Sequence, residues 1–242
     1  MPTHRNGSIH IYYEEHGAGF PILLLAPGGM RSAIALWSKA PWNPIAELAG
    51  RFRVIALDQR NAGRSSAPVR GDDGWHRYVS DQLALLDHLK IEHCHVIGDC
   101  IGGAFALGLI RLAPDRIASA VLQQPIGLDG DNRSAFHALF DDWSRQLAMT
   151  QPTVSDAEWQ AFRARMYGSD FVFSVDRGWL RHCPVPLLVL LGNDLYHPEP
   201  VSREIVQLAP HAELIERWKE LESLPLAVEQ VRHFLERHTP SA

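Results

Sequence analysis

The chain has 242 residues, of which 46% are hydrophobic and 21% charged, and its net charge at pH 7 is −5. This length and composition predict one well-cored globular domain, or one domain with an inserted segment. The mild acidity and the lack of any basic run argue against a nucleic-acid-binding protein. No apolar stretch approaches the roughly 18 residues of a membrane span, so we also expect no membrane partner.

Three cysteines occur, at Cys94, Cys100 and Cys183. Their number is odd and their spacing is not that of paired metal ligands, so we expect reduced thiols and a cytoplasmic protein. Residues 1–8 lack the apolar region of a signal peptide, which agrees with that location.

The first part of the chain alternates between strand and helix patterns. Polar and apolar residues alternate over 8–16, which predicts a strand with one buried face. A continuous apolar run over 21–26 predicts a strand that is buried on both faces of a parallel sheet, and 52–58 is the next expected strand. Helical spacing follows over 37–48 and, most clearly, over 78–89.

The same alternation continues to the C-terminal end of the sequence, apart from one interruption. The expected strands are 95–97, 118–125, 186–191 and 212–216, and the expected helices are 103–113, 201–208 and 224–237. This order predicts an α/β fold with a mostly parallel central sheet flanked by helices. Residues 127–183 interrupt it, since they are more polar, rich in aromatic residues and without a sheet strand. We interpret 127–183 as a helical lid over one end of a single domain.

The sharpest predicted turn lies between a buried strand and a helix, at Gly98-Asp99-Cys100-Ile101-Gly102. Glycines two residues before and after Cys100 remove Cβ atoms that would collide in such a turn. Cys100 would then adopt a strained conformation at a helix N-terminus, with its thiol exposed. The backbone N–H groups there suit a developing oxyanion. A cysteine after a core strand can also be inert packing.

Four motifs in this order resemble the α/β-hydrolase fold family along nearly the whole chain. They are the glycine loop 25–29, the turn 58–65 with its D-x-R-N-x-G-x-S pattern, the turn 98–102 and the Gly192-Asn193-Asp194 loop. The resemblance implies that fold, with 98–102 as its nucleophile elbow and cysteine where serine is usual.

The resemblance also implies roles for individual residues. Cys100 would be the nucleophile, as in dienelactone-hydrolase-like members, and Asp194 the acid that orients the base. The backbone N–H groups of Gly29 and Ile101 would form the oxyanion hole. The family places its general base, a histidine, between the last strand and the last helix, but here residues 217–223 contain none.

Another histidine must therefore serve as base if the triad is complete. His197 is the best placed, three residues after Asp194 at the end of a strand. His76, expected before a helix, and His137, within 127–183, are candidates to line a pocket. The remaining candidates, which we expect to be surface residues, are His211, His233 and His238.

The sequence predicts neither a metal nor a cofactor. His93-Cys94-His95 would offer at most two ligands on one face of a strand, so a structural strand is favoured over a zinc site. Neither glycine loop matches a dinucleotide or phosphate-binding pattern.

A thiol needs less activation than a hydroxyl, and a helix N-terminus lowers the pKa of a cysteine. We therefore expect Cys100 to be partly ionised near neutral pH, with Asp99 opposing this if its carboxylate lies close. The favoured function is acyl transfer on a small ester, thioester or lactone, with His197 or a water as proton relay. The alternatives are a lyase-like reaction, a protein that binds a ligand without turnover, and a structural partner. The expected partner is a small molecule, and a homodimer is left open.

Overall fold

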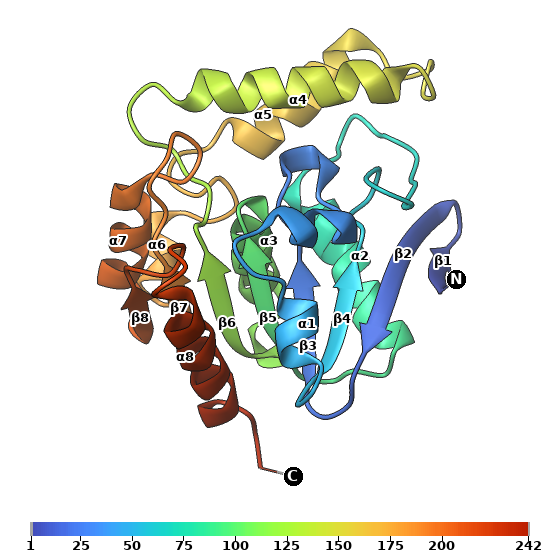
Figure 1. Cartoon of the computed structure of the whole chain (residues 1–242). Coiled ribbons are helices and arrows are strands. Elements are labelled where there is room, and N and C mark those ends of the chain that lie inside the picture. Colours follow the sequence, from blue (N-terminus) through green and yellow to red (C-terminus); the bar gives the residue numbers. More distant parts are fainter. Residues whose placement is uncertain (1, 242) are drawn as a thin grey trace.

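The computed structural model describes residues 2–241 and has one eight-stranded sheet with helices on both faces (Figure 1). The strands are β1 Thr3–Asn6, β2 Ile9–His16, β3 Pro21–Leu25, β4 Arg53–Leu57, β5 Cys94–Asp99, β6 Ile117–Gln123, β7 Leu187–Leu190 and β8 Ala212–Ile215. Their order in the sheet is β1-β2-β4-β3-β5-β6-β7-β8. Strands β1 and β2 pair antiparallel, as do β2 and β4, and every other pair is parallel. The predicted mostly parallel sheet is confirmed.

Eight α-helices and three short 3-10 helices connect the strands of the described chain. The α-helices are α1 Pro44–Leu48, α2 Trp75–His88, α3 Ile101–Leu112, α4 Arg133–Ala148, α5 Asp156–Tyr167, α6 Arg177–Leu180, α7 Glu199–Leu208 and α8 Leu224–Arg237. The 3-10 helices are η1 Gly29–Arg31, η2 Ile34–Lys39 and η3 Pro114–Arg116. Within residues 2–241, no helix combines the length and the apolar character that crossing a bilayer would demand.

The central strands supply two separate hydrophobic cores, one on each face of the sheet. Successive residues point to opposite faces, so in β3 Leu23 belongs to one core and Leu24 to the other. Helices α2, α3 and α7 cover the first face, and α1 and α8 cover the second. This double burial explains why the strands are continuous apolar runs in the sequence.

The N-terminal part differs from the sequence analysis in one strand that was not predicted and one helix that was. Thr3–Asn6 forms the edge strand β1, although this short polar stretch has no strand signal of its own. Residues 37–48 do not form one helix: the segment contains the 3-10 helix η2 and, after a break, helix α1, which begins at Pro44. Proline fits the first turn of a helix but not its interior, so Pro44 marks the start of α1.

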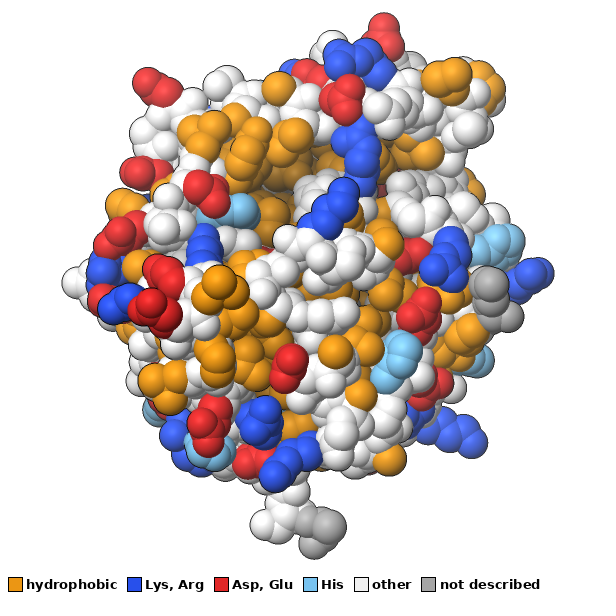
Figure 2. All heavy atoms as spheres, in the orientation of Figure 1, with side chains coloured by type: hydrophobic (Ala, Val, Ile, Leu, Met, Phe, Trp, Pro, Cys, Tyr) orange, Lys and Arg blue, Asp and Glu red, His pale blue; other side chains and the backbone are white. Residues whose placement is uncertain are grey.

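Helices α4 and α5 lie across the end of the sheet at which the parallel strands terminate (Figure 1). Both belong to residues 127–183, which were expected to be helical excursions. Helix α5 begins with a capping box, in which Ser155 and Glu158 satisfy each other's backbone N–H groups. Figure 2 shows hydrophobic side chains gathered in the hollow between this layer and the body of the molecule.

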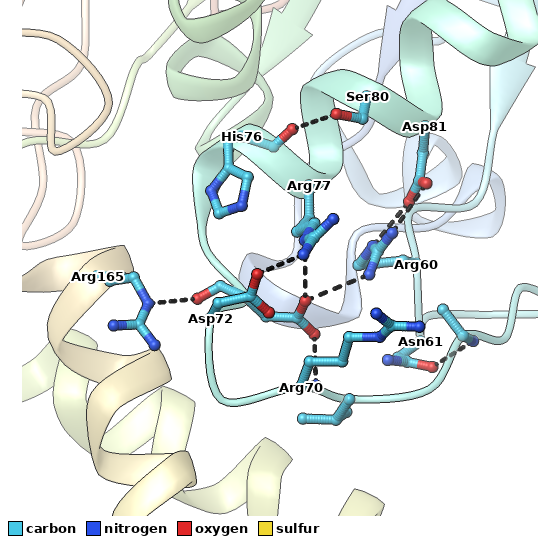
Figure 3. A network of polar contacts seen from close by, with 12 residues as sticks. Arg60, Asn61, Arg70, Asp72, His76, Arg77, Ser80, Asp81 and Arg165 are labelled. Carbon is cyan, nitrogen blue, oxygen red and sulfur yellow. Dashed lines mark hydrogen bonds and ion pairs between the residues drawn. The ribbon is translucent and has the colours of Figure 1, made fainter.

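A buried ion pair anchors the turn after β4 to helix α2 (Figure 3). Arg60 donates two hydrogen bonds to Asp81, at 2.7 and 2.9 Å, and its guanidinium lies 3.6 Å from the carboxylate of Asp73. All three side chains are at most 5% exposed. Burial acts to raise the pKa of Asp81, while the hydrogen bonds from Arg60 act to lower it. Because each charge has a partner, the turn can be buried against α2.

We expect Asp81→Asn to lower the free energy of unfolding by about 3–5 kcal/mol, because it leaves the buried guanidinium of Arg60 without its bidentate partner. Asp87→Asn on the same helix is the matched control, since Asp87 is 65% exposed in its pair with Arg116. Asp87→Asn should lower the free energy of unfolding by at most about 1 kcal/mol. Urea denaturation of both variants tests this, and equal losses would contradict it.

Candidate active site

Cys100 occupies the sharp turn between β5 and α3, as the sequence predicted. Its backbone angles are φ 59° and ψ −119°, a conformation that is strained for any residue with a side chain. A Cβ on Gly98 would lie 2.1 Å from the carbonyl oxygen of Gly102, and one on Gly102 would lie 2.0 Å from the carbonyl oxygen of Leu25. The residues two positions before and after Cys100 must therefore be glycine.

A cavity of about 230 Å³ opens beside Cys100 beneath α4 and α5. Four of the five residues predicted for the site line it: Cys100, His197, Gly29 and Ile101. The fifth, Asp194, lies behind His197. The sequence reasoning did not anticipate the rest of the lining, which consists of Gly28, Ile126, Phe136, Leu139, Tyr167 and Tyr196. Aromatic richness in 127–183 was the only signal for two of these residues, Phe136 and Tyr167.

Asp194 holds His197 in one orientation. The Nδ1 atom of His197 lies 2.8 Å from Oδ2 of Asp194, while Oδ1 of Asp194 accepts hydrogen bonds from the backbone N–H groups of Tyr196 and His197. Nε2 of His197 is buried and has no hydrogen-bond partner among the described residues. With Nδ1–H donating to the carboxylate, Nε2 is left as a proton acceptor.

Burial lowers the pKa of His197 below its ordinary value, although Asp194 acts to raise it. The imidazole is thus neutral at pH 7. Burial acts to raise the pKa of Asp194, but the hydrogen bonds and charge of His197 lower it on balance, so its carboxylate is ionised. Together the two residues form a neutral base backed by a fixed negative charge.

The expectation of an ionised thiol was wrong. Burial, together with the charge of Asp99, raises the pKa of Cys100 to about 12. The backbone N–H groups of Gly28, Ile101 and Gly29 act in the opposite direction but do not balance these effects. The expectation that Asp99 would oppose ionisation of the Cys100 thiol is therefore confirmed. A helix N-terminus cannot by itself ionise a thiol that is packed among apolar groups.

Asp99, the residue before Cys100, is a buried carboxyl that does not line the cavity. Its side chain is almost fully buried, Oδ1 accepts a hydrogen bond from Nε2 of Gln124 at 3.0 Å, and Oδ2 has no partner among the described residues. Burial raises the pKa of Asp99 to about 7, although Gln124 and the charge of Lys219 lower it. The carboxyl thus changes charge near neutral pH.

Lys219 lies in the segment where the family resemblance places a histidine. Its ammonium group donates to Oδ1 of Asn193 at 2.8 Å, and the charges of Asp194 and Asp99 act on it. The neighbouring Trp218 donates from Nε1 to the carbonyl of Leu191, which fixes the segment against β7. Segment 217–223 therefore contributes a positive charge behind the Asp194–His197 pair. The sequence showed that segment 217–223 has no histidine, but it did not predict that Lys219 would place a positive charge there.

The other candidate histidines do not line the cavity. His76 lies in the first turn of α2 and not before a helix, and His137 lies on α4. His211 and His233 are exposed and His238 is partly exposed.

His93-Cys94-His95 has no metal-site geometry. His93 is exposed before β5, Cys94 is in the core, and His95 contacts Ser119 and Thr239. Across residues 2–241, no three histidine, cysteine or acidic side chains are grouped so that they could hold a metal ion. All three cysteines are free thiols.

The protein-family model described as alpha/beta hydrolase fold matches residues 21–226 of this sequence. That range is most of the chain and includes every residue of the site described above. The chain belongs to the alpha/beta hydrolase fold family. The membership confirms the resemblance drawn from the four glycine-containing motifs.

Several similar curated proteins are hydrolases by name. Over 122 residues the chain is 36% identical to a putative carbamate hydrolase RutD of Azorhizobium caulinodans, covering 50% of this chain and 43% of that protein. Over 115 residues it is 32% identical to 2-hydroxymuconate semialdehyde hydrolase of a Pseudomonas species, covering 47% and 39%. The aligned part spans less than half the length of these relatives.

Solved structures share the fold over nearly the whole chain. A meta-cleavage product hydrolase (CumD) has a TM-score of 0.73 at 21% identity, with 98% of each chain covered. The enol-lactonase of Burkholderia xenovorans has a TM-score of 0.71 at 23% identity, covering 97% of this chain and 100% of its own.

We expect Asp99→Asn to speed alkylation of Cys100 by iodoacetamide above pH 7, because it removes a negative charge that raises the pKa of the thiol. Each unit by which that pKa falls gives about tenfold more thiolate. The difference from the wild type should shrink below pH 7, where Asp99 is itself protonated. Peptide mass spectrometry resolves Cys100 from Cys94 and Cys183.

Asp87→Asn again serves as the control, since it removes a carboxylate from the exposed side of α2. Equal labelling of Cys100 in the wild type and Asp99→Asn at pH 8 would show that Asp99 does not influence the thiol.

Proposed function

We propose that the protein hydrolyses a small ester, thioester or lactone through a covalent intermediate on Cys100. One observation carries this proposal: a thiol on a strained turn and the unpartnered Nε2 of His197 face the same cavity. The relatives support it by their names, which describe hydrolysis of a carbamate and of a semialdehyde, together with an enol-lactonase of the same fold.

The proposed reaction starts from a neutral thiol and a neutral imidazole. No hydrogen bond joins Cys100 to His197 within the described chain, so a bound water or the substrate must complete the path between them. His197 accepts the thiol proton as sulfur attacks the carbonyl carbon. The backbone N–H groups of Gly29 and Ile101 then hold the negatively charged oxygen.

Collapse of this tetrahedral intermediate breaks the bond to the alcohol or thiol of the substrate, which leaves with the proton that His197 carries. The acyl group remains on Cys100 as a thioester. A water molecule attacks the thioester while His197 accepts its proton, and the acid product leaves as Cys100 recovers its proton. Asp194 stabilises the imidazolium in both steps.

The cavity points to a small and uncharged acyl group. All of its lining side chains are neutral at pH 7, and most are apolar or aromatic. Phe136 and Leu139 come from α4 and Tyr167 from α5. Residues 127–183 therefore cover one side of the proposed site. We infer that this segment is the lid expected from the sequence. An exposed ion pair of 2.6 Å between Arg31 and Asp142 links it to the loop after β3.

A second candidate function is ligand binding without turnover. The raised pKa of Cys100 and the lack of a direct hydrogen bond to His197 favour it. The two functions differ in whether an acyl group ever becomes attached to sulfur.

We expect Cys100→Ala to abolish turnover of p-nitrophenyl acetate and short acyl thioesters, because it removes the nucleophile. His197→Ala should lower kcat/KM by about 10²- to 10⁴-fold, the range for loss of a general base. His233→Ala is the matched control, because His233 is an exposed histidine on α8 and should leave kcat/KM unchanged. Intact-protein mass spectrometry should trap an acylated wild-type protein. Turnover that survives Cys100→Ala would refute the proposal, and ligand binding with no turnover would favour the second candidate.

The acidic limb of the pH profile should follow His197. Because burial lowers the pKa of His197, kcat/KM should fall on acidification with an apparent pKa below the ordinary histidine value of 6.5. Activity is lost as the base becomes protonated, so it should be full at pH 7. A limb centred above pH 7 would assign the base to another group.

A further inference from the structure

A second hollow lies on the other side of an aromatic wall from Cys100. It is a groove of about 420 Å³ bounded by the start of α2, the end of α3, the end of α5 and the loop 169–174. Tyr167, which lines the Cys100 cavity, has its ring centroid 6.5 Å from that of Trp75 and 5.3 Å from that of Phe173 in this groove. The aromatic wall therefore separates two distinct sites.

Two arginines line the groove without a carboxylate partner. Arg165 donates from Nε to the backbone carbonyl of Asp73 at 3.1 Å, and Arg111 makes one long contact with the carbonyl of Ser174. Neither forms an ion pair within residues 2–241, although most arginines of this chain do. No acidic side chain lines the groove.

The acidic groups around the groove are already engaged. In the adjoining hollow, which shares Arg111, Asp170 pairs with Arg133 and Asp176 accepts a hydrogen bond from the backbone N–H of Trp179. Asp72 pairs with Arg77, and Asp73 pairs with Arg60 and Arg77, whereas Arg165 reaches only a backbone oxygen (Figure 3). The guanidinium nitrogens Nη1 and Nη2 of Arg165 have no acceptor in the described chain. Their charge is thus available to a ligand.

A buried hydroxyl in the groove also lacks a partner. Ser174 is 9% exposed, and its Oγ makes no hydrogen bond to the described residues. Leaving a buried hydroxyl unpaired costs about 1–3 kcal/mol, so such groups mark places where a bound molecule supplies the partner. The 14-residue helix α2 begins at the groove with no side-chain cap, and its N-terminal N–H groups favour an anion there.

The remaining lining is apolar. Trp75, Val79, Phe173 and Leu112 line the groove, and Leu112 is 59% exposed. Positive charge and apolar surface thus lie together. This combination suits a molecule with an anionic group and an apolar body.

We propose that this groove binds a small organic anion, a carboxylate attached to an aromatic or short alkyl group. The carboxylate pairs with Arg111 and Arg165 and accepts a hydrogen bond from Ser174 Oγ, while the apolar body packs on Trp75 and Leu112. The proposal does not depend on the reaction at Cys100. The Cys100 cavity has no arginine or lysine in its lining, so the two sites differ in the charge they accept.

Isothermal titration with phenylacetate, using the intact protein, tests the charge requirement. Phenylacetate should bind, and its affinity should fall with added salt. The neutral isostere phenylacetamide should bind at least tenfold more weakly because it lacks the charge. Inorganic phosphate should also bind more weakly because it lacks the apolar body. Equal affinity for phenylacetate and either comparator would overturn the proposal.

Substitutions of groove residues test whether phenylacetate binds in the groove. Arg165→Gln and Ser174→Ala should each weaken phenylacetate binding about five- to tenfold or more. Ser174→Ala removes an unpaired hydroxyl, so it should not reduce thermal stability, and its effect on binding is then a direct one. Arg181→Gln is the matched control, since Arg181 is an exposed arginine outside the groove that contacts only a backbone carbonyl.

Alkylating Cys100 with iodoacetamide beforehand distinguishes the groove from the Cys100 cavity. Binding that persists after alkylation and is lost in Arg165→Gln supports the groove. Binding that disappears on alkylation, or that Arg181→Gln weakens equally, would overturn the assignment.

Discussion

The close contact of three backbone segments at Cys100 is the constraint on which the site depends. Glycine at 98 lets β5 approach the start of α3, and glycine at 102 lets α3 approach the carbonyl of Leu25 at the end of β3. Because β3 and β5 are neighbours in the sheet, the loop after β3 lies beside the thiol. A single steric condition thus brings together the sulfur and the N–H groups of Gly29 and Ile101, and a larger side chain at either glycine would separate them.

Electrostatics at the site fit the proposed mechanism, in which a proton is transferred at the moment of reaction and the nucleophile carries no permanent charge. The Cys100 thiol and the His197 imidazole are both neutral at pH 7, while the carboxylate of Asp194 and the ammonium of Lys219 lie behind them. Separating charge between sulfur and imidazole is favourable only if something stabilises both ions. Asp194 stabilises the imidazolium, and the backbone N–H groups stabilise the negative charge.

Much of this arrangement was predictable because it is local in the sequence. The turn at Cys100 is specified by two glycines within five residues, and helix α8 was predicted with its observed bounds, 224–237, from its apolar spacing. Strand β1 escaped prediction because its pairing with β2, and not its own residues, makes it a strand. The protonation state of Cys100 also escaped, because it depends on burial by residues such as Tyr167 that are distant in the chain.

The Asp194–His197 pair lies within four consecutive residues, closed by reciprocal backbone hydrogen bonds of 3.2 Å between these two residues. Acid and base therefore form one rigid module, whose internal geometry costs little chain entropy because no long loop has to be closed. The pair needs to be placed only relative to β5, through the pairing of β6 with β5 and β7. The segment before α8 is consequently released from supplying a base. The contact between Asp194 and His197 is made without any residue of that segment.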